Sequence, residues 1–265
     1  EKIDYDAQME IQCRPEAALW AKGDGPYPVR FFHLGRLFLT PVKIYTVREG
    51  TAREVRYSSQ MFNFGKADFA AALPDDIGFA GFRVMHSRMG ERDWLAFLGA
   101  SYFRSAGELN QYGISARGIA IDTVLPTGEE FPRFTRFWLE PAANPQAVMI
   151  YALLEGPSIT GAYRIEALRQ ERVVMDVEAV LFFRTTIRRL GVAPLTSMFW
   201  FSETNHQPNW DWRPEIHDSD GLALWTGAGE RVWRPLNNPL TVQTSSFFDE
   251  NPKGFGLSQR DRNFQ

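Results

Sequence analysis

The chain has 265 residues and a net charge of −3, so it lacks the basic excess that binding to nucleic acids or anionic lipids requires. Hydrophobic residues make up 44% and charged residues 23%, as in globular proteins that bury a sizeable core. No apolar run approaches the ~18 residues of a membrane-spanning helix. Cys13 is the single cysteine, which excludes an intrachain disulfide and a cysteine-based zinc site.

Alternation of apolar and polar residues, the period of a half-buried strand, is the dominant pattern. The segments that predict strands are, in chain order, 29–39, 42–47, 53–57, 82–86, 95–104, 115–123, 131–139, 147–154, 160–166, 173–181, 197–202, 222–226, 232–235 and 241–248. In 173–181 the alternation predicts one apolar face opposite two carboxylates. In 131–139 it predicts that Phe134 and Phe137 lie on opposite faces.

Helical signals are scarce. Short turns are predicted at 15–20, where a proline stands at the first helical position, and at 58–64, 68–73 and 186–190. Many short strands separated by glycine and proline turns predict an antiparallel all-β architecture, and no linker or repeat marks an internal domain boundary. The chain begins at Glu1 without an initiator methionine or apolar leader, so we expect a mature or trimmed product, in which a removed signal peptide would leave no trace.

Metal and nucleophile motifs are weak. The histidines show no HxxxH or HxH spacing; they are His33, His86, His206 and His217. Residues 218–221 (DSDG) resemble the opening of a calcium loop, but the third acid is missing and the position of the bidentate glutamate is Gly229. There is no GxSxG elbow and no phosphate-binding loop. We expect no metal and no cofactor.

Two carboxylates in residues 214–222 have a spacing that suits acid–base chemistry. If this segment is extended, Asp218 and Asp220 share one face at roughly 6.5–7 Å. Inverting glycosidases hold two carboxyl groups about 6.5–9.5 Å apart, with a water between them. The alternative is an Asx-turn before a hairpin, in which Gly221 takes a positive φ.

Aromatic rings interleaved with polar groups form a second pattern, in residues 101–104 (SYFR), 111–118 (QYGISARG), 129–134 (EEFPRF) and 233–239 (WRPLNNP). Sugars are bound by such sets, because their C–H faces lie on aromatic planes while their hydroxyls bond planar polar groups. The alternative is ordinary pairing of arginine with glutamate on a sheet face. Residue type alone leaves both open.

Several strings resemble the family of periplasmic glucan biosynthesis proteins G and D. They are 98–104 (LGASYFR), 112–123 (YGISARGIAIDT), 129–132 (EEFP), 159–163 (ITGAY), 193–199 (APLTSMF), 216–220 (IHDSD), 234–239 (RPLNNP) and 251–257 (NPKGFGL). The resemblance implies a large antiparallel β-sandwich of the galactose-mutarotase-like kind, followed by a small immunoglobulin-like domain. It also implies the Gram-negative periplasm and a role in making osmoregulated periplasmic glucans with a β-1,2-linked backbone.

The resemblance further implies an inverting glycosidase or a transglycosylase in which Asp218 is the general base and Asp220 supports it. The general acid of the family lies well downstream of the string that matches 259–264 (QRDRNF). We therefore expect residues 1–265 to be an N-terminal sandwich domain, incomplete at its C-terminal end, that lacks the general acid on its own.

Substrate-binding residues follow from residue type and position within these strings. Arginines are expected to hold hydroxyls or acidic partners and aromatic residues to stack on sugar rings; the candidates are Tyr102, Arg104, Tyr112, Arg117, Trp225, Trp233 and Arg234. The expected partners are β-1,2-linked glucan and the membrane glucan synthase. A second hypothesis is a non-catalytic protein that binds glucan and shapes or escorts the growing chain.

Overall fold

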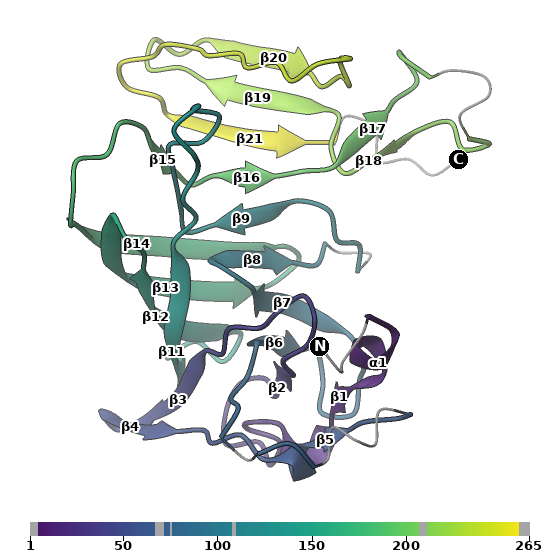
Figure 1. The fold of residues 1–265 in the computed structure, drawn as a ribbon, viewed down its shortest axis with the longest axis vertical. Helices are drawn as coiled ribbons and strands as arrows, with labels where there is room; N and C mark the ends of the chain where they lie inside the picture. Colours follow the sequence, from purple (N-terminus) through teal and green to yellow (C-terminus); the bar gives the residue numbers. More distant parts are fainter. Residues whose placement is uncertain (1–4, 67–71, 75, 108–109, 207–210, 260–265) are drawn as a thin grey trace. The chain divides into compact units, whose positions relative to one another are not determined.

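The computed structural model describes residues 5–66, 72–74, 76–107, 110–206 and 211–259 (Figure 1). Strands are by far the most common regular element among these residues, which confirms the all-β prediction; the helical elements that lie wholly within the described residues are α1 (Tyr5–Glu10), η1 (Pro15–Ala17) and η2 (Ser59–Met61). Within this part of the chain, no helix has the length and hydropathy to cross a bilayer. The chain divides into two compact units, residues 1–111 with 117–192 and residues 112–116 with 193–265.

The first unit contains a long sheet with the strand order β14-β13-β12-β11-β3-β4. Its strands are β3 (Lys43–Arg48), β4 (Thr51–Glu54), β11 (Arg133–Pro141), β12 (Ala147–Glu155), β13 (Ile159–Arg169) and β14 (Val173–Phe183). All neighbours are antiparallel except β3 and β11, which run parallel. The antiparallel prediction therefore holds for this sheet with one exception.

A second group of antiparallel strands in the same unit has the order β8-β7-β6-β2. They are β2 (Val29–Phe32), β6 (Gly81–Met85), β7 (Asp93–Leu98) and β8 (Tyr102–Ser105). Two short pairs complete the unit: β1 (Gln12–Cys13) with β5 (Phe62–Asn63), and β10 (Ile119–Ile121) with β15 (Leu190–Val192).

Phenylalanine rings pack the two sheets of the first unit against each other. Phe82 and Phe97 stack at 5.0 Å, and the ring of Phe137, from the long sheet, meets them edge-on at 5.1 and 5.5 Å. All three side chains are at most 3% exposed. Such ring pairs contribute about 0.5–1.5 kcal/mol each beyond the area that they bury, so these contacts join the layers of the sandwich.

A β-bulge decides which side chains of β11 enter this core. The pairing of β11 with β12 shifts between Phe134 and Arg136, so one extra residue stands on β11. Phe134 and Phe137 are consequently both buried, with ring centroids 5.5 Å apart. The prediction from strict alternation, which put them on opposite faces, is wrong.

The second unit is built from short strands. A three-stranded antiparallel sheet has the order β20-β19-β21, with β19 (Gly221–Trp225), β20 (Arg231–Pro235) and β21 (Gly254–Ser258). Beside it in sequence, β17 (Phe199–Phe201) pairs with β18 (Ile216–His217). In addition, β16 (Leu195–Thr196) pairs with the start of β9 (Ser115–Arg117).

Several predicted elements differ from the observed ones. The strand predicted at 95–104 is two strands, β7 and β8, because the chain reverses at Gly99 and Ala100, which have φ of 73° and 41°. The strand predicted at 29–39 ends at Phe32, residues 241–248 form no strand, and residues 186–190 contain no helical turn. Most of the turn predicted at 68–73 lies outside the described residues.

The apolar face predicted for 173–181 is not buried. β14 lies at one end of the long sheet, where it pairs with β13 alone. Of the side chains on the predicted face, Val177 is 45% exposed, and Val173, Met175 and Leu181 are only half-buried. Alternation correctly predicted the strand, but burial also requires a layer that covers it.

His33 is a buried histidine whose environment favours the neutral ring. Its Nδ1 lies 2.6 Å from the carbonyl oxygen of Leu34 and its Nε2 lies 2.8 Å from the hydroxyl of Tyr57. A neutral ring that carries its proton on Nδ1 donates to Leu34 and accepts from Tyr57, which satisfies both nitrogens. Burial lowers the pKa of His33, because the charged ring loses its hydration.

We expect the free energy of unfolding to fall as the pH drops from 7 to 5. The lowered folded pKa of His33 means that its contribution is present above the unfolded pKa of about 6.5 and is lost as the pH falls through the folded value. Urea denaturation across this range should show a weaker pH dependence for His33→Gln. Some dependence should remain, because burial also lowers the pKa of His86. Equal slopes in both proteins would contradict this assignment.

Candidate functional site

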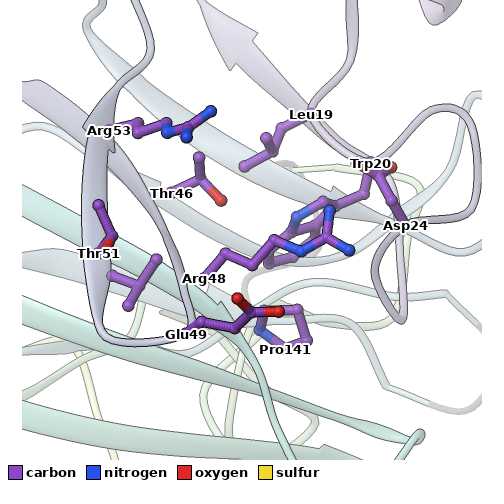
Figure 2. A pocket seen from close by; sticks show the side chains of 10 residues that line it. Leu19, Trp20, Asp24, Thr46, Arg48, Glu49, Thr51, Arg53 and Pro141 are labelled. Atoms are coloured by element: carbon purple, nitrogen blue, oxygen red, sulfur yellow. The ribbon is translucent and has the colours of Figure 1, made fainter.

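Two cavities of the first unit could receive a ligand. One, of about 610 Å³, lies beside the hairpin of β3 and β4 and contains none of the residues singled out from the sequence (Figure 2). The other, of about 390 Å³, is mainly apolar and includes Tyr102, one of the predicted sugar-stacking residues, next to Phe38 and Arg133.

Arg117 is held between two aromatic rings. Its guanidinium carbon lies 4.1 Å from the ring centroid of Tyr102 and 4.1 Å from that of Phe131. Burial lowers the pKa of Arg117, and its Nε is buried without a hydrogen-bond partner among the described residues. One face of Tyr102 is thus covered by a cation, which leaves only the other face for stacking on a sugar. Arg104 lies exposed on β8, the strand of Tyr102.

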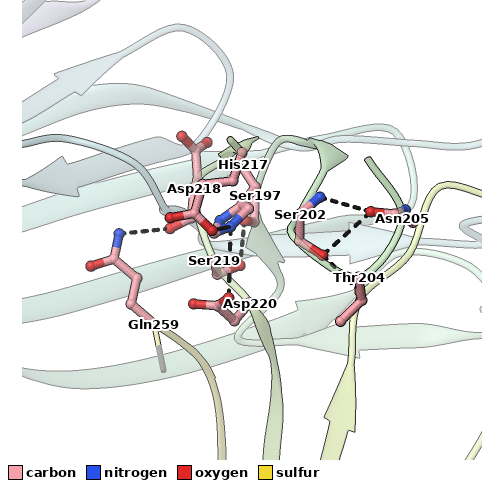
Figure 3. A network of polar contacts seen from close by, with 10 residues as sticks. Ser197, Ser202, Thr204, Asn205, His217, Asp218, Ser219, Asp220 and Gln259 are labelled. Carbon is pink, nitrogen blue, oxygen red and sulfur yellow. Dashed lines mark hydrogen bonds and ion pairs between the residues drawn. The ribbon is translucent and has the colours of Figure 1, made fainter. Parts of the chain in front are cut away.

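The second unit holds Asp218 in a short link between β18 and β19. The Asp218 N–H donates to the carbonyl oxygen of Met198 (2.8 Å), and Asp218 Oδ2 accepts the Met198 N–H (3.0 Å). The Gln259 amide donates to the carbonyl oxygen of Asp218 at 3.2 Å, as Figure 3 shows. These bonds fix the backbone and one carboxylate oxygen of Asp218. Among the described residues, no hydrogen-bond donor reaches the other oxygen, Oδ1.

Gly113 packs closely against Asp218. A Cβ at position 113 would lie 3.3 Å from the Cβ and 3.5 Å from the Cγ of Asp218. The first distance is tighter than ordinary van der Waals contact, so a side chain at this position would press on the carboxylate. Gly113 has no positive φ, which means that close approach rather than backbone conformation calls for glycine here.

Gly113→Ala is therefore expected to fold normally but to displace the Asp218 carboxylate by a few tenths of an ångström. The resemblance implies a general-base role for Asp218 in glucan turnover. Misplacement of a catalytic group can cost up to about 10²-fold in rate, so this expected role predicts a loss of up to that size. Initial rates and thermal unfolding would be measured together, so that a loss of rate is separated from a loss of stability. A fully active Gly113→Ala would show that this close approach is not needed.

His217 lies between two carboxylates. Its Nε2 is 3.0 Å from Glu215 Oε2 and 3.6 Å from Asp220 Oδ1, and its side chain is 6% exposed. The ring of Phe199 stacks on it, with centroids 5.5 Å apart and planes inclined by 14°. Packing and hydrogen bonding therefore fix the imidazole on the same segment as Asp218.

Glu215, His217 and Asp220 place three potential metal ligands within 4.8 Å of one another. A metal-bound histidine almost always donates its other ring N–H to an acceptor. His217 Nδ1 is buried and has no partner among the described residues. A proton on Nε2, donated to Glu215, satisfies the ring better, so the geometry favours a hydrogen-bonded histidine over a metal ligand.

Asp218 and Asp220 do not lie on an extended strand as the spacing argument assumed. Residues 218–220 lie outside the strands, and the two carboxylates contact different groups, Met198 and His217. The alternative of an Asx-turn with a left-handed Gly221 is also wrong, because Gly221 has no positive φ and begins β19. A Cβ there would lie 2.6 Å from the ring of Trp233, so this glycine allows close packing.

Trp225 and Trp233 lie on one face of the three-stranded sheet. Cross-strand partners share a face, and Trp225 pairs with Arg231 while Trp233 pairs with Ala223. The Arg231 guanidinium stands 3.7 Å from the Trp225 ring, so part of that ring is already covered. Arg234 lies on the opposite face, 5.4 Å from the ring of Phe247.

The structure thus places the predicted residues in two groups. Tyr102, Arg104 and Arg117 belong to the first unit. The second unit holds Tyr112, Asp218, Asp220, Trp225, Trp233 and Arg234. Sequence reasoning missed Met198, which acts through its backbone groups, and Gln259, whose side-chain amide bonds the carbonyl oxygen of Asp218. Gly113 lies within the string 112–123. The sequence signal that could have revealed its role is that this glycine stands outside a turn.

Comparison with known proteins places this geometry in context. A family model described as "Periplasmic glucan biosynthesis protein, MdoG" matches residues 1–265. The chain is 53% identical, over 99% of its length, to glucans biosynthesis protein D 2 of Ralstonia nicotianae, of which it covers 51%. It is 52% identical to the probable glucans biosynthesis protein D of Shewanella oneidensis, over 99% of this chain and 49% of that relative.

Glucans biosynthesis protein D of Xanthomonas oryzae pv. oryzae is 51% identical over 100% of this chain, which covers 50% of the relative. The chain therefore spans about half the length of the curated relatives it matches.

Proposed function

Because the chain belongs to the family of periplasmic glucan biosynthesis proteins, MdoG, we propose that it acts on the β-1,2-linked backbone of periplasmic glucans. The proposed activity is that of an inverting glycosidase or a transglycosylase with Asp218 as the general base. The location that we propose is the periplasm, with the membrane glucan synthase as a partner.

The observation that carries this proposal is the hydrogen bonding of the Asp218 carboxylate. Its Oδ2 is held by the Met198 N–H, whereas Oδ1 has no donor among the described residues. Oδ1 is the oxygen that takes the proton of the attacking water or acceptor hydroxyl. The fixed backbone and the absence of a side chain at Gly113 support this role, because a general base must be within hydrogen-bond reach of the proton it takes.

Inversion also needs an acid to protonate the leaving oxygen. We place this acid beyond Gln265, in the part of the relatives that this chain does not cover. Asp220 does not fit the role, since its carboxylate lies beside His217 rather than beside Asp218 Oδ1. Asp220 instead supports the site by positioning His217.

A second candidate function is binding of glucan without cleavage. The two tryptophans on one sheet face favour it, because Ala223 and the glycines of β21 give them small neighbours. A Cβ at Gly254 or Gly256 would meet no atom within 4 Å, so the surface above β21 is open. Aromatic residues beside an open strip suit the C–H faces of a sugar chain.

Time-resolved product analysis with linear β-1,2-glucan separates the two functions. We expect a protein that continues beyond residue 265 to shorten the polymer, and residues 1–265 alone to bind it without shortening it. Polymer that stays intact with both proteins would favour the binding function. Shortening by residues 1–265 alone would show that the acid lies within them.

Binding should depend only weakly on salt, because the chain has a net charge of −3 and the proposed ligand is neutral. Calorimetry with β-1,2-gluco-oligosaccharides at 50 and 500 mM salt is expected to give affinities that agree within about twofold. A steep loss of affinity at high salt would indicate an ionic ligand and contradict the proposal, as would the absence of binding at both concentrations.

A further inference from the structure

The hairpin of β3 and β4 carries a polar face where the sandwich core ends. Ile44 is fully buried, and Thr46 and Arg48 follow it on the same face of β3. Their cross-strand partners are Arg53 and Thr51, respectively, so two arginines and two threonines alternate on this face. The face that is apolar at Ile44 thus becomes polar within one strand.

This polar face lines the cavity of about 610 Å³ shown in Figure 2. Trp20 also lines it; its side chain is 5% exposed and its backbone has a φ of 62°. A Cβ at Gly25 would lie 2.3 Å from the indole, so the missing side chain of Gly25 lets the indole pack against the backbone. Trp20 is therefore a rigid part of the wall. Asp24 and Glu49 add two carboxylates to the lining.

The polar side chains of this cavity do not satisfy one another. Among the described residues, its four charged side chains make no hydrogen bond and no ion pair; they are Asp24, Arg48, Glu49 and Arg53. The hydroxyls of Thr46 and Thr51 make no hydrogen bond within the same part of the chain. Their donors and acceptors are available to a ligand. Two guanidinium groups and two carboxylates carry no net charge, which disfavours an anion and a cation alike.

We propose that this cavity is a second sugar-binding site, which takes a neutral, polyhydroxylated ligand such as one or two glucose units of an oligosaccharide. Hydroxyl groups both donate and accept, so they match a lining that offers guanidinium donors and carboxylate acceptors together. Its volume falls within the range of about 300–1,000 Å³ that small-molecule sites occupy. None of its lining residues belongs to the Asp218 segment, so the site would hold glucan without cleaving it.

The test uses the Asp218→Asn variant of the full-length protein, in which sugar is not consumed, and follows backbone amide resonances by NMR. Sophorose, the β-1,2-linked glucose disaccharide, is the probe. We expect it to shift the amides of residues 46–53. Adding both Arg48→Ala and Arg53→Ala to this variant should weaken the affinity measured from those shifts by roughly tenfold or more, because charge-assisted hydrogen bonds to the sugar are lost.

A matched control removes two exposed arginines from outside the cavity, Arg172→Ala with Arg188→Ala, and should leave the affinity unchanged. Amide shifts near residue 218 report binding at the proposed glucan site separately. An absence of binding there can therefore be told apart from an absence of binding at the cavity. Absence of shifts in residues 46–53, or an equal affinity in the Arg48 and Arg53 variant, would overturn the proposal. So would shifts of these amides by inorganic phosphate but not by sophorose.

Discussion

Asp218→Asn is expected to reduce glucan turnover by about 10²–10⁴-fold, the usual contribution of a general base. The asparagine carbonyl can still accept the Met198 N–H, so the link between β18 and β19 should keep its conformation. The amide nitrogen then replaces the oxygen that takes the proton, and it has no basic lone pair. Initial rates of glucan shortening, glucan affinity and thermal unfolding should be measured on the same preparation, and only the rate should change.

Asp220→Asn is the matched comparison, because it makes the same chemical change two residues away. Its carboxylate lies beside His217, so we expect a smaller loss of rate than for Asp218→Asn. Turnover at a near wild-type rate in Asp218→Asn would refute the assignment of the base. Equal losses in the two variants would mean that the two carboxylates act together.

Phe97→Ala should have the largest effect on stability, about 3–5 kcal/mol, which is typical of a buried phenylalanine replaced by alanine. Phe97 is 1% exposed and stacks on Phe82 and Phe103 at 5.0 and 5.3 Å. It also meets Phe137 of the facing sheet. The cavity left by alanine would therefore remove contacts within one sheet and between the two layers. Urea denaturation followed by tryptophan fluorescence would measure the change.

Phe255→Ala provides the control, since Phe255 is 52% exposed on β21. Its replacement should change the free energy of unfolding by no more than about 0.5 kcal/mol, as for most surface substitutions. A loss for Phe97→Ala as small as this would show that the aromatic cluster does not hold the sandwich together.

The sequence predicted most strands well, because alternation of side chains is a local property. It failed where the arrangement depends on a partner strand. The bulge beside Phe134 is an example: an extra residue on β11 is defined only by its pairing with β12, so no pattern within β11 reveals it. The exposure of Val177 on β14 is another, since burial depends on a covering layer that the strand itself does not encode.

For the candidate site, the sequence named residues but did not predict their geometry. The IHDSD string pointed to Asp218, but the assumption of an extended segment gave the wrong relation between Asp218 and Asp220. Met198 contributes only its backbone N–H and carbonyl groups, which every residue except proline carries. Its role could not be predicted from its side chain. Gly113 was detectable in principle, because a glycine outside a turn often marks a close approach.

The parallel pairing of β3 with β11 has a consequence for how the first unit folds. Lys43 pairs with Arg136, and the chain between them contains β6, β7 and β8, which pair with their sequence neighbours. Those local hairpins can form early, whereas the pairing of β3 with β11 must wait until a long loop closes and its entropy is lost. We therefore expect the joining of β3 to β11, rather than the local pairing of β11 to β14, to be the slow step of folding. Apolar residues such as Phe82 and Phe97 would stay exposed until Phe137 of β11 packs against them.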